Sequence, residues 1–190
     1  MNHSPTQRHT TPDKDAIALL PPFERLGLER ITLVSTAEQA RSAAAALTQA
    51  TAWGFDTESK PTLLKGQKSE GPHVLQFATT EKAFIFQSHV AESHAAIIDL
   101  LNAVLKSPEP RARAQAVRVL CYWRDRVPNA LDLLGAAVKD AYPRVRLEAV
   151  RAASFFNGAD TVRAIEIANA VSSDKDYYID YCFRETMKQL

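Results

Sequence analysis

The stretch PRARAQAVR at residues 110–118 returns as PRVRLEAVR at residues 143–151, a shift of 33 residues. Six of the nine positions are identical: the proline, the arginines in second and fourth place, and the closing Ala-Val-Arg. The correspondence continues, because the aromatic pair at 122–123 aligns with the one at 155–156. At matching places in a repeat, these aromatics are expected in the core between helices and not as base-stacking side chains. A period of this length is typical of helical repeats, in which each unit is one supersecondary element.

Each unit carries the signals of a helix, a turn and a second helix. Pro110 and Pro143 stand where a first helical turn begins, and an acidic break follows each second helix at Asp140 and Asp174. A third, incomplete unit begins near Asp176. The pattern resembles HEAT repeats, which stack helix pairs into a solenoid and mostly bind other macromolecules. The resemblance implies an all-α part over residues 108–190 whose role is to bind a partner.

A second informative stretch is Phe55-Asp56-Thr57-Glu58, which closes an apolar run that begins at residue 51. Side chains alternate along a β-strand, so Asp56 and Glu58 share one face while Phe55 and Thr57 take the other. Paired carboxylates of this kind suit Mg²⁺ or Mn²⁺, ions that polarise phosphates and activate water. The alternative interpretation is a polar strand end with two solvated acids.

The sequence FDTESKP at residues 55–61 is followed by GPHVLQFAT at 71–79 and AFIFQ at 83–87. This succession resembles the 3′-5′ exonuclease family of RNase D type, over about residues 21–107. The resemblance implies an RNase H-like sheet, Mg²⁺ or Mn²⁺ as cofactor and nucleic acid as substrate. It makes Asp56 and Glu58 the first two of four catalytic, metal-binding carboxylates.

The rest of the family pattern does not follow in order. No tyrosine has an aspartate four residues later, and the helix predicted from Pro110 stands where the family continues into a strand. His94 and Asp99 fit H-x-x-x-x-D spacing, but they follow the last strand directly. The site is therefore expected to be incomplete, and the strand that carries Asp56 is expected to have an open edge.

Basic side chains offer two candidate contact sites. Lys60 and Lys65, close to the acidic pair, are candidates for contact with a substrate phosphate, or are ordinary surface lysines. Two pairs of arginines, each with its members seven residues apart on one helix face, predict a ridge that binds a phosphate backbone or an acidic protein partner: Arg111 with Arg118, and Arg144 with Arg151. In the alternative interpretation, Glu148 pairs with its neighbouring arginines on a solvated face.

The amino-acid composition excludes some classes of protein but does not point to one function. The chain has 190 residues, a net charge of +1 and 46% hydrophobic residues, so no global charge draws it to nucleic acid or to a membrane. No stretch approaches the roughly 20 apolar residues of a membrane span, and no membrane partner is expected. Cys121 and Cys182 are far apart in apolar helical settings, which predicts free thiols in a reducing, cytoplasmic environment.

The expected fold class is α+β, a partial RNase H-like sheet with helices followed by an all-α HEAT-like repeat. Strands are predicted at 30–34, 52–58, 74–79 and 83–86, and helices at 36–50, 94–106 and from 110 onward. The expected division is a disordered leader at 1–20, a truncated exonuclease-like domain at 21–107 and the repeats at 108–190.

Three functions are open at this point. The first is an exonuclease-like nucleic-acid-binding protein, a hydrolase with an incomplete metal site. The second is a non-catalytic scaffold that binds a protein through its repeats. The third is an artificial fusion, or chimera, without an evolved function.

Overall fold

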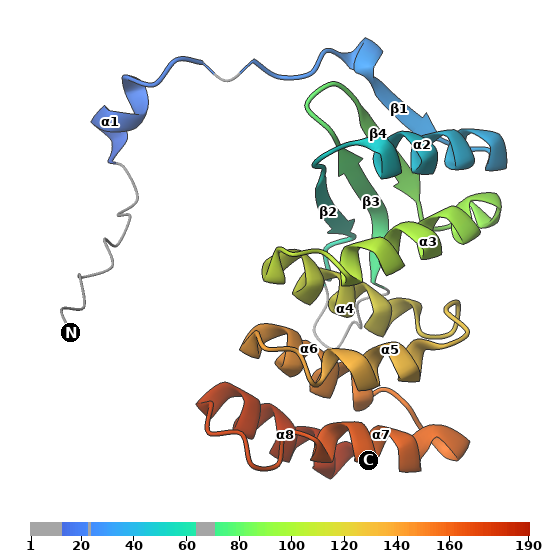
Figure 1. The fold of residues 1–190 in the computed structure, drawn as a ribbon, viewed down its shortest axis with the longest axis vertical. Coiled ribbons are helices and arrows are strands. Elements are labelled where there is room, and N and C mark those ends of the chain that lie inside the picture. The colour runs from blue at the N-terminus through green and yellow to red at the C-terminus, as the bar shows by residue number, and fades with distance from the viewer. Residues whose placement is uncertain (1–12, 23, 64–70) are drawn as a thin grey trace.

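The computed structural model describes residues 13–22, 24–63 and 71–190. The chain is α+β, with a small mixed sheet followed by stacked helices (Figure 1). The strands are β1 (Ile31–Val34), β2 (Gly54–Ser59), β3 (Pro72–Ala78) and β4 (Ala83–Gln87). The α-helices are α1 (Lys14–Ala18), α2 (Ala37–Gln49), α3 (His94–Leu105), α4 (Pro110–Trp123), α5 (Ala130–Ala137), α6 (Pro143–Ala153), α7 (Thr161–Asn169) and α8 (Tyr177–Gln189). Short 3-10 turns lie at Leu28–Arg30, Ala91–Ser93 and Gly158–Asp160.

The four strands are ordered β1-β4-β3-β2, with β1 parallel to β4 and the other neighbours antiparallel. The predicted hairpin of β3 and β4 is confirmed, and its register places Leu75 beside Phe86 and Phe77 beside Phe84. Within the described residues β2 pairs only with β3, so the expected open edge at the strand of Asp56 is confirmed.

The two faces of the sheet differ sharply in burial. Alternate side chains on one face, among them Val34, Leu75 and Phe86, are fully buried and join one core with Leu47 of α2 and Ile97 of α3. The side chains between them point to the opposite face, where burial is partial or absent. A sheet covered on one side alternates apolar and polar residues in this way.

The helical half continues directly from the sheet half. Helix α3 packs on α2 and on α4, and the helices α4, α6 and α8 then stack in a row beside α5 and α7 (Figure 1). One continuous set of buried side chains runs from Val34 in β1 to Ile179 in α8. A polar contact joins the halves as well, because Gln115 Nε2 in α4 donates to Thr57 Oγ1 in β2 at 2.9 Å.

The stack of helices is fixed by an arginine–aspartate pair that repeats. Arg113 in α4 donates from Nε and Nη2 to the two carboxylate oxygens of Asp140, at 2.7 and 2.8 Å. In the next unit, Arg146 of α6 donates from Nε to Asp174 Oδ2 at 2.9 Å, and its Nη2 lies 2.7 Å from the same oxygen. In both pairs the side chains are less than one-fifth exposed. A bidentate guanidinium–carboxylate contact fixes geometry as well as charge.

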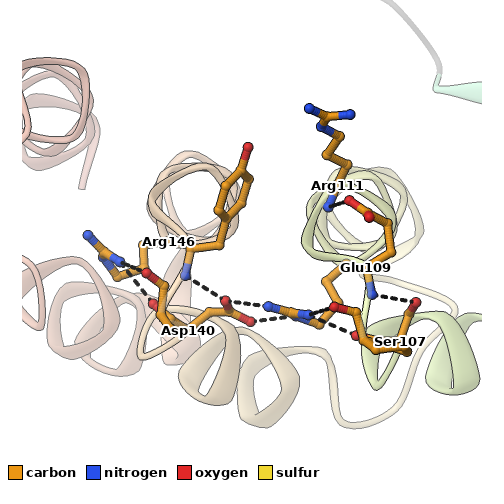
Figure 2. A network of polar contacts seen from close by, with 9 residues as sticks. Ser107, Glu109, Arg111, Asp140 and Arg146 are labelled. Atoms are coloured by element: carbon orange, nitrogen blue, oxygen red, sulfur yellow. Dashed lines mark hydrogen bonds and ion pairs between the residues drawn. The ribbon is translucent and has the colours of Figure 1, made fainter. Parts of the chain in front are cut away.

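These pairs also organise the turns between repeat units (Figure 2). Asp140 accepts a further hydrogen bond from the backbone N–H of Tyr142, and Arg146 Nη1 donates to the Asp140 carbonyl oxygen at 2.9 Å. The hydrogen bond from Arg113 lowers the pKa of Asp140, and the backbone N–H of Asp176 lowers the pKa of Asp174. Both aspartates are therefore stabilised in the charged form.

The sequence predictions of strands and helices are confirmed to within a few residues. Two details of the repeat differ from expectation. The aromatic pair at 155–156 was expected in the core, but Phe155 is 45% exposed because it follows the end of α6. Glu148 does pair with arginines, but it is buried and not on a solvated face. Of the predicted leader, residues 1–12 lie outside the described residues, and α1 follows them.

We predict that Asp140→Asn lowers the free energy of unfolding by about 1–3 kcal/mol at pH 7, because Arg113 loses its charged partner. The pKa of Asp140 is lowered in the folded state, so its contribution is complete above its ordinary pKa of 3.8 and is lost as pH falls through the folded value. The difference between wild type and variant should therefore shrink below about pH 4.

Urea denaturation followed by circular dichroism at a series of pH values measures this difference. Asp125→Asn is the matched control, since the Asp125 side chain is 84% exposed and only 4.0 Å from Arg124. Equal stabilities of Asp140→Asn and Asp125→Asn would contradict a structural role for the Arg113–Asp140 pair.

The shared core predicts that the two halves unfold together. Trp53 packs against Phe77 beside the sheet, whereas Trp123 is buried in α4 with its ring against His94 of α3, so Trp53 reports on the sheet and Trp123 on the junction of the two halves. Trp123→Phe leaves Trp53 as the only tryptophan, and Trp53→Phe leaves Trp123. In each variant the fluorescence and circular dichroism transitions should coincide. Separate transitions would instead support a fusion of two independent parts.

Candidate functional site

The acidic pair lies on the open face of the sheet. Asp56 and Glu58 are exposed side chains of β2, and between them Thr57 points to the covered face and accepts the hydrogen bond from Gln115. Asp56 Oδ1 accepts from the backbone N–H of Thr57 at 2.8 Å. The alternation expected from the sequence is therefore present, with both carboxylates in solvent.

These residues do not fit a two-metal site on their own. Within the described ranges, no group of three or more His, Cys, Asp and Glu side chains is arranged to hold a metal ion, and a two-metal site needs more than two carboxylates. His94 is engaged elsewhere, with Nε2 2.9 Å from the Ser88 carbonyl oxygen and its ring edge-on to Trp123. Asp99 is exposed farther along α3.

The two predicted lysines have different outcomes. Lys60 is exposed, and its backbone N–H donates to His73 Nδ1 at 3.1 Å at the end of β2. Lys65 lies outside the described residues. A phosphate contact by either side chain stays a prediction.

A cavity of about 400 Å³ lies where β2 meets α4. It brings together predicted residues of both halves, because Glu58 and Arg118 line it with Gln115 and Tyr122. The chain approaches Tyr122 closely at Gly71, which has φ +87°, and a Cβ there would lie 2.5 Å from the Tyr122 Cβ. Only glycine fits this position, because both the backbone conformation and the space exclude a side chain.

The four repeated arginines separate into two kinds. Arg111 and Arg118 are exposed. In Figure 2 the Arg111 side chain points away from Asp140 and Arg146. Arg144 and Arg151 bracket Glu148, at 2.9 and 3.0 Å, and the Glu148 side chain is only 3% exposed. The arginines therefore do not form one uniform ridge.

A strip of stacked arginine and aromatic side chains crosses α4 and α6 instead; we call Tyr122, Arg124, Arg151 and Phe155 the arginine–aromatic strip. The Arg151 guanidinium carbon lies 5.9 Å from the Tyr122 ring centre and 6.0 Å from that of Phe155. Arg124 lies 5.7 Å from the Phe155 ring centre. Within the described residues the buried Nη2 of Arg151 has no hydrogen-bond partner, and the faces of these rings stabilise its charge.

A groove of about 450 Å³ continues the strip between α6 and α8; we call it the α6–α8 groove. Its walls include Leu147, Phe155, Tyr178 and Tyr181, of which the last three are 45%, 69% and 55% exposed. Cys182 also lines it, and burial raises the pKa of this thiol, which keeps it protonated. Both cysteines are free, as the sequence predicted.

Sequence reasoning missed Arg124 and the pairing of Arg113 with Asp140. Arg124 lies outside the repeated stretch, and its counterpart 33 residues on is Asn157, so no pattern marked it. The pairing had a signal, because Arg113 and Arg146 recur after 33 residues, and Asp140 and Asp174 recur after 34.

Comparison with known proteins supports the helical repeat predicted for the C-terminal half. Residues 97–179 match the family model of HEAT repeats, so this part of the chain is a HEAT-like helical region. Among solved structures, the crystal structure of the Aedes aegypti Nibbler EXO domain gives a TM-score of 0.42 at 15% identity, covering 88% of this chain and all of that one. A TM-score below 0.5 carries no argument about activity. Comparison with curated proteins gives no significant match.

No helix among the described residues is long and apolar enough to cross a membrane.

The geometry of the acidic pair predicts no nuclease turnover beyond background. With a 3′-labelled single strand and Mn²⁺, wild type and Asp56→Asn prepared in the same way should release nucleotides at the same low rate, because two exposed carboxylates cannot hold two metal ions. A Mn²⁺-dependent rate that disappears in Asp56→Asn would contradict this and would place further ligands outside the described residues.

Proposed function

We propose that this chain is a non-catalytic scaffold that binds a protein partner through its helical repeats. The observation that carries the proposal is the α6–α8 groove, in which Phe155, Tyr178 and Tyr181 stand exposed beside stacked arginines. Single exposed apolar residues are ordinary on a protein surface, but a cluster around a groove is typical of an interaction site.

The arginines of the strip are arranged to receive an acidic group. Arg124 and Arg151 are held against Phe155, so little side-chain entropy remains to be lost when they bind. Glu148 already compensates part of the charge of Arg144 and Arg151. The nearest carboxylate to Arg124 is Asp125, which is 4.0 Å away and exposed, a weak pair in water. Arg124 therefore keeps a largely uncompensated charge beside Phe155, at the margin of a groove whose lining also contains Glu185.

This chemistry defines the partner that we propose. It is a peptide segment of another protein with an aromatic or large aliphatic side chain for the groove and a carboxylate next to it for the arginines. A nucleic acid fits less well along α4, because Glu58 lies beside Arg118 and would repel a phosphate backbone there.

A peptide selection tests the proposal. Random 12-residue peptides displayed on phage are selected on the whole chain, and the enriched sequences should combine Asp or Glu with a neighbouring aromatic or Leu residue. The affinity of a selected peptide, measured by fluorescence anisotropy, should fall about tenfold or more in Phe155→Ser and in Arg124→Glu, a loss of about 1.4 kcal/mol or more.

The control is Val162→Ser, which removes a 69% exposed apolar side chain from α7 and does not touch the groove. Its affinity for the selected peptide should equal that of wild type. Selected peptides that bind Phe155→Ser as well as wild type would contradict the proposal. Tight binding of a labelled single-stranded oligonucleotide, with no peptide selected, would move the assignment to nucleic acid.

A further inference from the structure

Helix α8 carries an exposed stripe of side chains, most of which belong neither to the core nor to the α6–α8 groove. Tyr177, Tyr181, Arg184 and Lys188 follow one another at spacings of four, three and four residues, which places them on one face of a helix. Tyr177 and Tyr181 are 71% and 55% exposed. The side chains of Arg184 and Lys188 are 59% and 70% exposed.

The stripe faces away from the rest of the molecule. On the opposite side of α8, Ile179 and Thr186 are buried, and Thr186 Oγ1 donates to the Val150 carbonyl oxygen of α6 at 3.3 Å. Helix α8 lies with α7 at the end of the stack that is remote from the sheet (Figure 1). The stripe therefore lies on the face of α8 that points away from α6.

We propose that this stripe pairs with the same stripe of a second copy of the chain, with the two α8 helices antiparallel. A two-fold axis between them places Tyr177 opposite Lys188 of the partner subunit and Tyr181 opposite Arg184 of the partner subunit. Each tyrosine ring then meets a cation, so one patch supplies four such contacts by symmetry.

The charges on α8 select this orientation. Asp180 flanks the stripe on the same side as Arg184, and the two form an ion pair at 2.8 Å within one copy. The antiparallel arrangement brings Asp180 next to Arg184 of the partner subunit, so each carboxylate lies between two guanidinium groups. A parallel arrangement would instead place Lys188 against Lys188 of the partner subunit, and like charges repel.

The helix also sets the strength of the association. Its 13 residues span about 20 Å at 1.5 Å per residue. One helix of this length buries less surface area than a standard protein–protein interface. The dimer is therefore weak and depends on concentration, with a Kd on the order of micromolar or higher.

Analytical ultracentrifugation of the whole chain, over about three decades of concentration around a micromolar Kd, measures the association. Wild type should show a monomer–dimer equilibrium. Asp180→Arg and Arg184→Asp each place like charges across the two-fold axis and should weaken the dimer at least tenfold. The double variant Asp180→Arg/Arg184→Asp restores opposite charges across the axis and should bind more tightly than either single variant, but more weakly than wild type because Tyr181 has lost the Arg184 cation.

The matched control is Arg163→Asp, which breaks the exposed ion pair with Glu166 on α7 and should leave the dimer unchanged. Circular dichroism confirms that each variant is folded. A wild type that stays monomeric, a dimer that neither single variant weakens, or a double variant that does not recover would overturn the proposal. None of the changed residues lines the α6–α8 groove, so failure here is distinct from failure of peptide binding.

Discussion

The helical half depends on one repeated contact, the guanidinium of a first helix bound to the aspartate in the turn before the next unit. Arg113 with Asp140, and Arg146 with Asp174, hold successive units at the same spacing and orientation. Because the carboxylate also accepts a backbone N–H of the following turn, each pair fixes the helix that comes next. Without these pairs the row of helices α4, α6 and α8 would lose its alignment. The surface that the three helices form together would then be lost as well.

The sheet half depends in turn on that row. Four strands covered on one side cannot bury much apolar area alone, and here α3 extends their core into α4. The same packing determines that the acidic pair is exposed to solvent. Thr57 and Phe55 point into the covered face, so Asp56 and Glu58 are left in solvent at an edge strand. The paired carboxylates thus stand here without a third ligand among the described residues.

The two surfaces that we propose for interaction differ in chemistry. The α6–α8 groove is mainly apolar, with arginines stacked on Phe155 at its margin, which suits the proposed acidic segment with an apolar anchor. The α8 stripe is divided between tyrosines at one end and cations at the other, which makes it complementary to itself when reversed. Tyr181 belongs to both, so peptide binding and self-association would influence each other through this residue.

The sequence by itself determined the strands, the helices, the repeat and the α+β class, because hydrophobic period, proline positions and the 33-residue shift are local or near-local signals. It also determined that Asp56 and Glu58 share a face. Only the tertiary structure decided which face is open, that Glu148 is buried between two arginines, and that Phe155 is exposed between Arg124 and Arg151. These outcomes depend on how separate helices pack, and a pattern along one chain does not contain the distance between two helices.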